Sequence, residues 1–139
     1  HGTLPRPAGR LEGYILKDEA KKQVTVSSRP RPGAKTAVTL YETLAVRNGL
    51  SLVRCQLITG RTHQIRAQFA AAGHPLLGDG KYGSERQNKR YGRSYQALYS
   101  YRLEFCFTTD AGALAPLDGQ QFQVEQVDFV TEYFPGFSL

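Results

Sequence analysis

Hydrophobic and polar residues alternate along much of the first half of the chain, with the period of a strand that has one buried face. The runs that carry this alternation are residues 10–16, 23–28, 36–46 and 50–58. A charged turn at 17–22 separates the first two runs. Asn48-Gly49, a pair typical of tight hairpin turns, separates the last two. The pattern predicts four strands, and the last two form a hairpin.

The period changes to that of a helix after residue 60. The apolar residues with helical spacing are Ile65, Phe69 and Ala72, at i, i+4 and i+7. Thr62 is a residue type that caps helix N-termini, and Gly73 is typical of the position just beyond a helix end. These signals predict a helix over residues 63–72.

The second half of the chain is less regular. Residues 78–96 are rich in glycine, tyrosine and basic residues and are predicted to form a long loop, which in a compact domain is usually functional or mobile. Residues 96–107 are predicted to form a strand, and residues 122–125 a last short strand before a helix or tail at 127–135. The predicted fold class is α+β, a mainly antiparallel mixed sheet with one main helix.

Composition places the chain among globular proteins, with 40% hydrophobic and 22% charged residues. No apolar run approaches the ~18 residues of a membrane span. Residues 1–9 are punctuated by Pro and Gly, and the chain has no Met, so we expect this stretch to be a linker or a cloning remnant. Cys55 and Cys106 lie in apolar runs and are predicted to be small buried hydrophobes. Two cysteines are too few for a disulfide framework, which favours a cytoplasmic location.

Charge is divided unevenly along the chain. Residues 1–102 hold all 18 Lys and Arg against six acidic residues, a net charge of +12. Residues 103–139 hold six acidic residues and no Lys or Arg. A basic body favours phosphate-rich partners such as nucleic acid, but a solvated surface with balanced charges explains the same composition. Charge alone leaves the two interpretations equally open.

The residue types that can do chemistry are densest between Thr59 and Arg66. Arg61 lies just before the predicted helix, where backbone N–H groups attract anions. The guanidinium groups of Arg61 and Arg66 suit a phosphate or carboxylate ligand, and they equally suit salt bridges that hold the helix to a loop. No Ser, Cys or Asp lies at a triad spacing from His63, so we interpret it as a hydrogen-bonding residue rather than a general base.

A carboxylate and several tyrosines are the remaining candidates. Asp79 lies between two glycines, and we interpret it as a turn residue that bonds to the backbone two residues on, rather than as a catalytic group. Tyrosines interleaved with basic residues are what stacking on single-stranded RNA requires. We nevertheless expect Tyr99 and Tyr101 to be core residues of their strand. Tyr82 stays open between stacking and packing.

The same segments resemble a known family. Residues 57–66 (Leu-Ile-Thr-Gly-Arg-Thr-His-Gln-Ile-Arg), 73–79 (Gly-His-Pro-Leu-Leu-Gly-Asp) and 81–83 (Lys-Tyr-Gly) are similar to the C-terminal motif of the RluA-type pseudouridine synthases. The similarity extends over roughly residues 10–130.

The resemblance implies an enzyme that isomerises uridine to pseudouridine in RNA, with ribosomal RNA the expected substrate, after flipping the base out of its stack. It implies no metal or organic cofactor. It also implies a catalytic aspartate paired with a basic residue, for which Arg66 is the first choice and Arg61 the second, and Ile65 as a wall of the base pocket. The residues expected to bind RNA are Arg61, Thr62, His63, Gln64, Lys81, Tyr82 and Arg86.

The chain departs from the family pattern in what it lacks. It contains neither the His-Arg-Leu-Asp motif that carries the family's catalytic aspartate nor the Lys-X-Tyr motif, and its 139 residues do not include the family's usual S4-like RNA-binding domain. Residues 10–139 are therefore expected to be the C-terminal portion of the catalytic domain, inactive alone. We expect such a portion to expose an apolar face or to self-associate. The alternative is a non-catalytic RNA-binding module that retains the basic groove.

Overall fold

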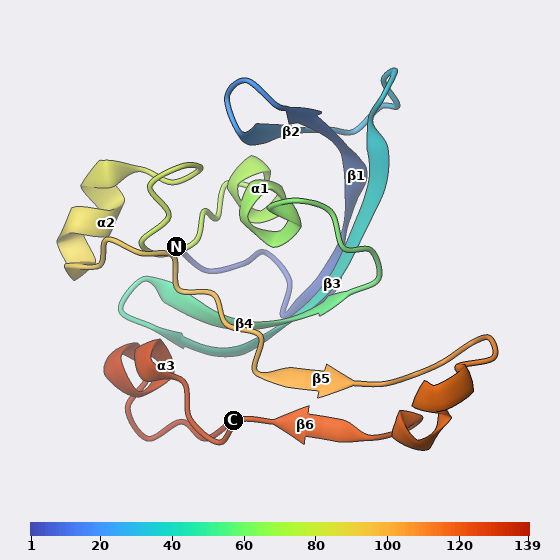
Figure 1. Cartoon of the computed structure of the whole chain (residues 1–139). Helices are drawn as coiled ribbons and strands as arrows, with labels where there is room; N and C mark the ends of the chain where they lie inside the picture. The colour runs from blue at the N-terminus through green and yellow to red at the C-terminus, as the bar shows by residue number, and fades with distance from the viewer. The chain divides into compact units, whose positions relative to one another are not determined.

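The structure is a computed structural model that describes all 139 residues. It divides into two compact units, residues 1–97 and residues 98–139 (Figure 1). The boundary between them lies inside the run 96–107, which the alternation pattern predicts to be one strand.

A four-stranded antiparallel sheet is the frame of the first unit. Its strands are β1 (Ala8–Asp18), β2 (Gln23–Ser27), β3 (Lys35–Arg47) and β4 (Leu50–Leu57), in the spatial order β2-β1-β3-β4. All four predicted strands are confirmed, and so is the hairpin between β3 and β4. Asn48 and Gly49 have φ angles of 50° and 74°, the positive values that a two-residue hairpin turn of this kind requires.

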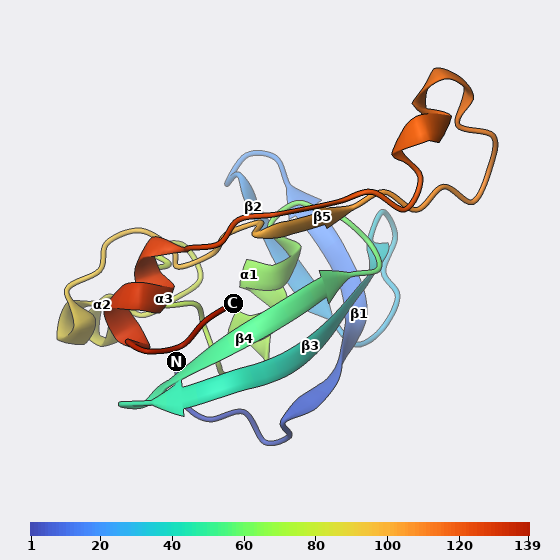
Figure 2. The same cartoon turned by 90° about the horizontal axis from the view of Figure 1, so that it is seen from below.

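Helix α1 (Gln64–Ala71) packs against β1, β2 and β3. Figures 1 and 2 both place it on one side of the sheet. The buried cluster between them consists of Ile15, Val24, Ala37 and Ala67, with Val26 and Tyr82 packed against it. Ala37 of β3 and Ala67 of α1 have small side chains. The helix therefore lies close enough to the sheet for polar side chains to reach the strand backbone.

The buried face of α1 differs from the predicted apolar stripe. Ile65 is only half-buried and Ala72 is exposed. The buried helix residues are Gln64, Ala67, Gln68 and Phe69. Hydrophobic periodicity misses this face because two of its members are glutamines whose amides bond to the sheet.

Gln68 fastens α1 to the two central strands. Its Nε2 donates to the carbonyls of Leu11 and Ala37 at 3.2 and 3.1 Å, and its Oε1 accepts from Thr39 Oγ1 at 2.7 Å. Thr39 is completely buried, and its Oγ1 in turn accepts from Gln64 Nε2 at 2.9 Å. Buried polar groups are tolerated when each has a partner, and this network also sets the position of α1 along the strands.

The two ends of α1 follow different rules. His63, not the predicted Thr62, occupies the N-cap position, with left-handed φ and ψ of 51° and 24° and no side-chain cap. At the other end Gly73 has φ of 86°, as predicted for a residue just past a helix. Its N–H donates to the Ala70 carbonyl, and the next N–H donates to the Phe69 carbonyl, which closes the helix in a Schellman motif.

A second helix, α2 (Glu85–Tyr91), lies within the predicted loop 78–96, which corrects that prediction. Its local signals are present in the sequence. Ser84 precedes it, Glu85 in the first turn pairs with Lys89 at 2.9 Å, and Gly92 ends it with φ of 68°. Asn88 is its only buried residue, so the helix has no apolar face for the periodicity to reveal.

The start of the chain is held in place, although residues 1–9 are predicted to be a linker. The His1 ammonium donates to the Pro75 carbonyl at 2.9 Å, and the Gly2 N–H donates to the Gly49 carbonyl at 2.7 Å. Strand β1 begins at Ala8, inside the predicted linker. Proline and glycine keep this stretch out of the sheet, but they do not prevent tertiary hydrogen bonds.

The second unit consists of short elements. Strands β5 (Arg102–Glu104) and β6 (Gln121–Gln123) pair antiparallel, and a 3₁₀ helix (Gly112–Leu117) and α3 (Asp128–Tyr133) accompany them. The last strand and the C-terminal helix are thus confirmed near their predicted places. The strand predicted over residues 96–107 is wrong for most of its length, because only three of its residues pair.

Several side chains that the pattern predicts to be buried lie at the surface. Tyr99 is 52% exposed, so its predicted place in a core is wrong, and Tyr101 is half-buried. Cys106 is exposed, whereas Cys55 is half-buried and burial raises the pKa of its thiol to about 12. The longest helix, α1, has eight residues, and no helix has the length and apolar character needed to cross a membrane.

Candidate functional site

The segment that joins β4 to α1 is fixed by a polar network. Thr59 Oγ1 accepts the Val38 N–H and donates to Gln64 Oε1, both at 2.8 Å. Gln64 Oε1 also accepts the Arg61 N–H at 3.0 Å. Because Gln64 is 3% exposed and its amide is used inside the fold, its predicted role in binding RNA is corrected to a structural one.

Arg61 and Thr62 are exposed at the N-terminus of α1. The Arg61 Nε donates to the Thr36 carbonyl at 3.0 Å, which anchors the base of the guanidinium to the start of β3. The residue is exposed, and this bond uses one of the five N–H donors of an arginine, which leaves the others available to a ligand. The helix end adds a partial positive charge beside it. This position therefore suits an anionic group that approaches from outside the chain.

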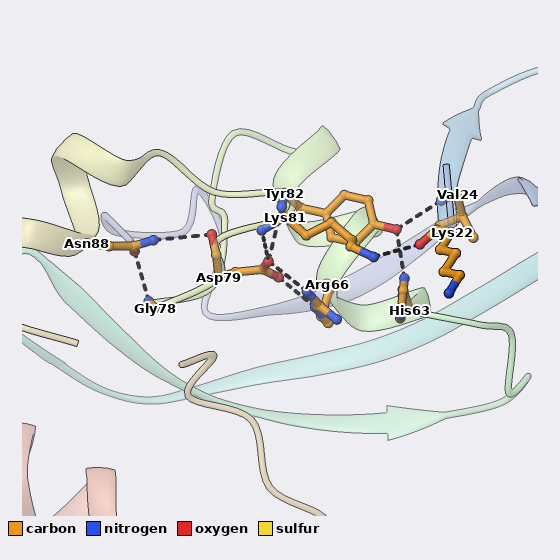
Figure 3. Close-up of polar contacts among 9 residues, drawn as sticks. All are labelled: Lys22, Val24, His63, Arg66, Gly78, Asp79, Lys81, Tyr82 and Asn88. Atoms are coloured by element: carbon orange, nitrogen blue, oxygen red, sulfur yellow. Dashed lines mark hydrogen bonds and ion pairs between the residues drawn. The ribbon is translucent and has the colours of Figure 1, made fainter. Parts of the chain in front are cut away.

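Arg66 already has a carboxylate partner. Its Nε and Nη2 donate to the two carboxylate oxygens of Asp79 at 2.7 and 2.9 Å, as Figure 3 shows. The Arg66 side chain is 14% exposed and that of Asp79 is completely buried. Of the two alternatives open for this arginine pair, Arg66 forms an internal salt bridge and Arg61 presents the solvent-facing guanidinium.

Asp79 organises the turn that follows it. Its Oδ1 accepts the backbone N–H groups of Lys81 at 2.9 Å and Tyr82 at 3.0 Å, which confirms its predicted role as a turn residue. Burial alone would raise the pKa of this carboxyl. The Arg66 hydrogen bond and the two backbone N–H groups outweigh burial, so the pKa lies below its ordinary value. Asp79 is consequently ionised at neutral pH, and its charge balances that of Arg66.

Tyr82 joins three segments. Its hydroxyl accepts the Val24 N–H of β2 at 2.9 Å and lies 2.9 Å from His63 Nδ1 (Figure 3). The Arg66 guanidinium lies over the ring, 5.3 Å from its centroid. The ring is half-buried against the core, so the structure gives Tyr82 a packing role.

His63 is a hydrogen-bonding residue, as predicted. Burial lowers the pKa of its imidazole, and the nearby positive charges of Arg66, Lys81 and Lys17 lower it further, while Asp79 opposes them. The Tyr82 hydroxyl, whose oxygen accepts the Val24 N–H, hydrogen-bonds to Nδ1 of the imidazole, and which of the two donates depends on the tautomer of His63.

The remaining candidate residues have different environments. Lys81 is exposed, and its Nζ donates to the Lys22 carbonyl at 2.7 Å. Ile65 is half-buried, and Arg86 is exposed on α2. Sequence reasoning missed Asn88, whose amide accepts the Gly78 N–H at 2.8 Å and donates to the Asp79 carbonyl at 3.2 Å. No local signal marks it, because its partners lie about ten residues away in the chain.

The chain is similar to RNA pseudouridine synthases in sequence. Residues 3–71 match the profile of the family described as "RNA pseudouridylate synthase". The chain is 37% identical over 129 residues to "Ribosomal large subunit pseudouridine synthase D" of Zymomonas mobilis, which covers 92% of this chain and 38% of that protein. It is 38% identical over 110 residues to an "Uncharacterized RNA pseudouridine synthase" of Mycobacterium bovis, covering 78% and 32%. The chain belongs to the RNA pseudouridine synthase family.

The RluA-type resemblance of the motif is consistent with this family. Another similar relative is an "Uncharacterized RNA pseudouridine synthase" of Bacillus subtilis, 42% identical over 84 residues, with 59% of this chain and 24% of that protein covered. The chain therefore spans between about a quarter and two fifths of the length of these synthases. The solved structure "Human RNA Pseudouridylate Synthase Domain Containing 1" matches with a TM-score of 0.63 at 20% identity, covering 95% of this chain and 61% of that one, which supports the α+β fold.

Proposed function

We propose that this chain is part of an enzyme that isomerises uridine to pseudouridine in RNA, and that it supplies the arginine of the active site. The observation that carries the proposal is the solvent-facing guanidinium of Arg61 at the N-terminus of α1, in a chain of this family. Arg66 is less suited to bind a carboxylate from outside the chain, because its Nε and Nη2 already donate to the carboxylate of Asp79. The first choice for that role therefore passes from Arg66 to Arg61.

The isomerisation moves one bond of the nucleoside. The bond between N1 of the base and C1′ of the ribose breaks, and a bond between C5 and C1′ forms. The hydrogen on C5 leaves as a proton, and N1 takes up a proton. The product has the same atoms and electrons as the substrate, so no oxidant or reductant is consumed. A carboxylate near the ribose and a cation that keeps it ionised and oriented are what the family resemblance implies for this step.

The aspartates of this chain have other tasks. Asp79 is buried against Arg66, and Asp18 accepts the Lys21 N–H in the β1–β2 turn. In the second unit Asp110 and Asp118 accept backbone N–H groups within their own loops, and Asp128 begins α3. We therefore propose that the catalytic carboxylate comes from polypeptide outside these 139 residues, and that the chain alone is inactive.

The substrate proposed is ribosomal RNA, because one similar relative is called a large-subunit ribosomal synthase. The alternative function is RNA binding without catalysis. It is favoured by the charge of the first unit, which has 17 Lys and Arg against six acidic residues, a net charge of +11. Both functions require RNA binding that weakens steeply with salt, because basic side chains release counterions from the phosphates.

A tritium-release assay together with an RNA-binding measurement tests whether the chain alone is inactive and whether it binds RNA. Ribosomal RNA labelled with tritium at C5 of uridine loses its label when C5 becomes the glycosidic carbon. We expect the 139-residue chain to bind this RNA and to release no tritium. Release of tritium would show that the missing-carboxylate proposal is wrong, whereas the absence of any RNA binding would contradict both functions.

A pair of arginine variants tests the assignment of Arg61. We expect Arg61→Gln to weaken RNA binding at low salt by roughly three- to tenfold, the loss of one phosphate contact. Arg47→Gln is the matched control, since Arg47 is exposed at the opposite end of β3 from Thr36. Equal effects of the two substitutions would contradict a specific role for Arg61.

A further inference from the structure

Basic side chains gather where the β1–β2 hairpin meets the N-terminus of α1, and the proposed reaction does not use them. Lys17 follows Ile15 by two residues along β1, so both side chains lie on the face of the sheet that α1 covers. Lys17 also pairs with Val24 in β2, whose N–H donates to the Tyr82 hydroxyl. Lys17 is therefore placed beside the contact between Tyr82 and His63.

Lys81 reaches the same place from a different segment. Its Nζ donates to the Lys22 carbonyl in the β1–β2 turn, and Figure 3 shows its side chain running past the Tyr82 ring to reach that carbonyl. The backbone of Lys81 is held by Asp79. Hydrogen bonds thus tie together the hairpin, the turn after Asp79 and the N-terminus of α1, and Lys17, Lys81 and His63 lie on these three segments.

The cluster has an excess of positive charge. The buried carboxylate close to it, Asp79, is already neutralised by Arg66. Lys17 also pairs with Glu19 at 2.8 Å, but Glu19 is 78% exposed. Exposed pairs of this kind contribute little to stability, so Lys17 can exchange Glu19 for a stronger anion. The lowered pKa of His63 has the same origin in part, since Arg66, Lys81 and Lys17 all disfavour its protonation.

We propose that Lys17, His63 and Lys81 together bind one phosphate group of the RNA backbone. This inference rests on the proposed function and extends its RNA-binding surface from Arg61, across the N-terminus of α1, to the β1–β2 hairpin. Two ammonium groups and an imidazole come from three segments, and each can donate a hydrogen bond to an oxygen of a phosphate. The site reads no base, so it positions the RNA strand rather than selecting its sequence.

Fluorescence anisotropy with a labelled RNA stem-loop tests the site, with KCl varied between about 50 and 200 mM. We expect Lys17→Gln and Lys81→Gln each to weaken binding roughly three- to tenfold at low salt. Each should also reduce the slope of log K against log salt by about 0.7 to 0.9, the value for one lost phosphate contact. The control is Lys89→Gln, because Lys89 is also exposed and paired with a glutamate, but on α2.

Nuclear magnetic resonance of the histidine rings gives a second readout. His63 faces Arg66, Lys81, Lys17 and Asp79, together with the Tyr82 hydroxyl. A phosphate bound among these groups favours the imidazolium, so the midpoint of the His63 titration should rise when RNA is added, and binding should tighten as the pH falls. The ring signals of His74, which bonds to the His1 carbonyl, serve as an internal reference.

The outcomes separate the site from the proposed function. If the wild-type chain binds RNA and Arg61→Gln weakens it but neither lysine variant does, the site is wrong and the function stands. Equal losses for Lys17→Gln, Lys81→Gln and Lys89→Gln would show only a general effect of charge and would overturn the site. A wild-type chain that binds no RNA would overturn the site and the function together.

Discussion

Strand β3 has 13 residues and hydrogen-bonds to a strand on each side, whereas β5 and β6 have three residues each and pair only with each other. In β3, Ala37 and Thr39 are completely buried beneath α1. In β5 and β6 every residue is exposed, including Leu103 and Phe122 at 53% and 55%. Both regions contain alternating sequence, so alternation produces a long strand only where another element packs on it.

The interiors of the two units differ as well. The first unit buries a salt bridge between Arg66 and Asp79 and the amides of two glutamines, each with partners. The buried residues of the second unit are apolar, Val127, Val130 and Phe134. Apolar contacts tolerate small shifts, whereas hydrogen bonds between buried groups hold only in one arrangement. The polar interior therefore defines where α1 and its neighbouring turn lie, which is what a site on their surface needs.

The largest effect is expected from removing the charge of Asp79. Asp79→Asn keeps the size of the side chain but leaves the mostly buried Arg66 without its counter-ion, which should lower the free energy of unfolding by about 3 to 5 kcal/mol. Urea unfolding followed by circular dichroism measures it. Asp118→Asn is the control, an aspartate in an exposed loop of the second unit. Similar losses for both variants would contradict the buried ion pair.

The same variant carries a pH signature. Because the folded-state pKa of Asp79 is lowered, its contribution is complete at neutral pH and is lost as the pH falls below the unfolded value of about 3.9 towards the folded one. The wild-type chain should therefore lose more stability than Asp79→Asn across this acid range. Parallel pH profiles would contradict the assignment.

Amide hydrogen exchange tests the comparison of the two regions directly. Amides of β3 should open only in near-global unfolding, whereas those of β5 and β6 open locally. We expect the β5 and β6 amides to be less protected by roughly a hundredfold, about 2 to 3 kcal/mol. Equal protection would show that the second unit is as firmly held as the first.

A smaller effect is expected from Gln68→Leu. The substitution keeps the volume but leaves Thr39 and two strand carbonyls without the amide, which should destabilise the first unit by about 2 kcal/mol. Gln87→Leu, at an exposed position of α2, is the matched control and should change stability by less than about 0.5 kcal/mol. A neutral Gln68→Leu would show that apolar packing alone positions α1.

The smallest expected effect belongs to His63. Its folded-state pKa is lowered, so the unfolded chain binds the proton more readily and stability decreases as the pH falls through the ordinary value of about 6.5. Solvent exposure keeps this decrease below about 1 kcal/mol. His63→Asn, which tolerates the left-handed backbone, should remove it. An unchanged pH dependence in that variant would show that a group other than His63 causes the loss of stability.

Local sequence signals predict most of the secondary structure of the first unit. The alternating runs place the four strands of the first unit, and Asn48-Gly49 places their hairpin. The extent of α1 was predictable, but its buried face was not. Gln64 and Gln68 are polar residues, and they are buried because their amides hydrogen-bond to the sheet. The local signals for α2 were present at Ser84, Glu85 and Gly92, but an apolar stripe was not.

The sequence predicts which segment contains the candidate site, but it does not predict how the side chains of that site are arranged. Arg61, His63 and Arg66 stand out by residue type, and Asp79 was interpreted correctly as a turn residue. Its pairing with Arg66 was not foreseeable, because the two are 13 residues apart in different elements. Lys17 is not among the residues that the sequence singles out, because only the packing of α1 and the following turn on the sheet brings it close enough to influence the charge of His63.

The sequence by itself determined the strands, the hairpin, the extent of the main helix and the family, because these depend on residue type and spacing along the chain. Only the tertiary structure decided which arginine forms a salt bridge within the chain and which is exposed to solvent. Arg61 and Arg66 have the same chemistry, and they differ in that Arg66 lies on α1 and pairs with the buried Asp79, whereas Arg61 precedes the helix and is exposed. The electrostatic interaction between two charges depends on their distance in space, and the number of residues between them in the sequence does not determine that distance.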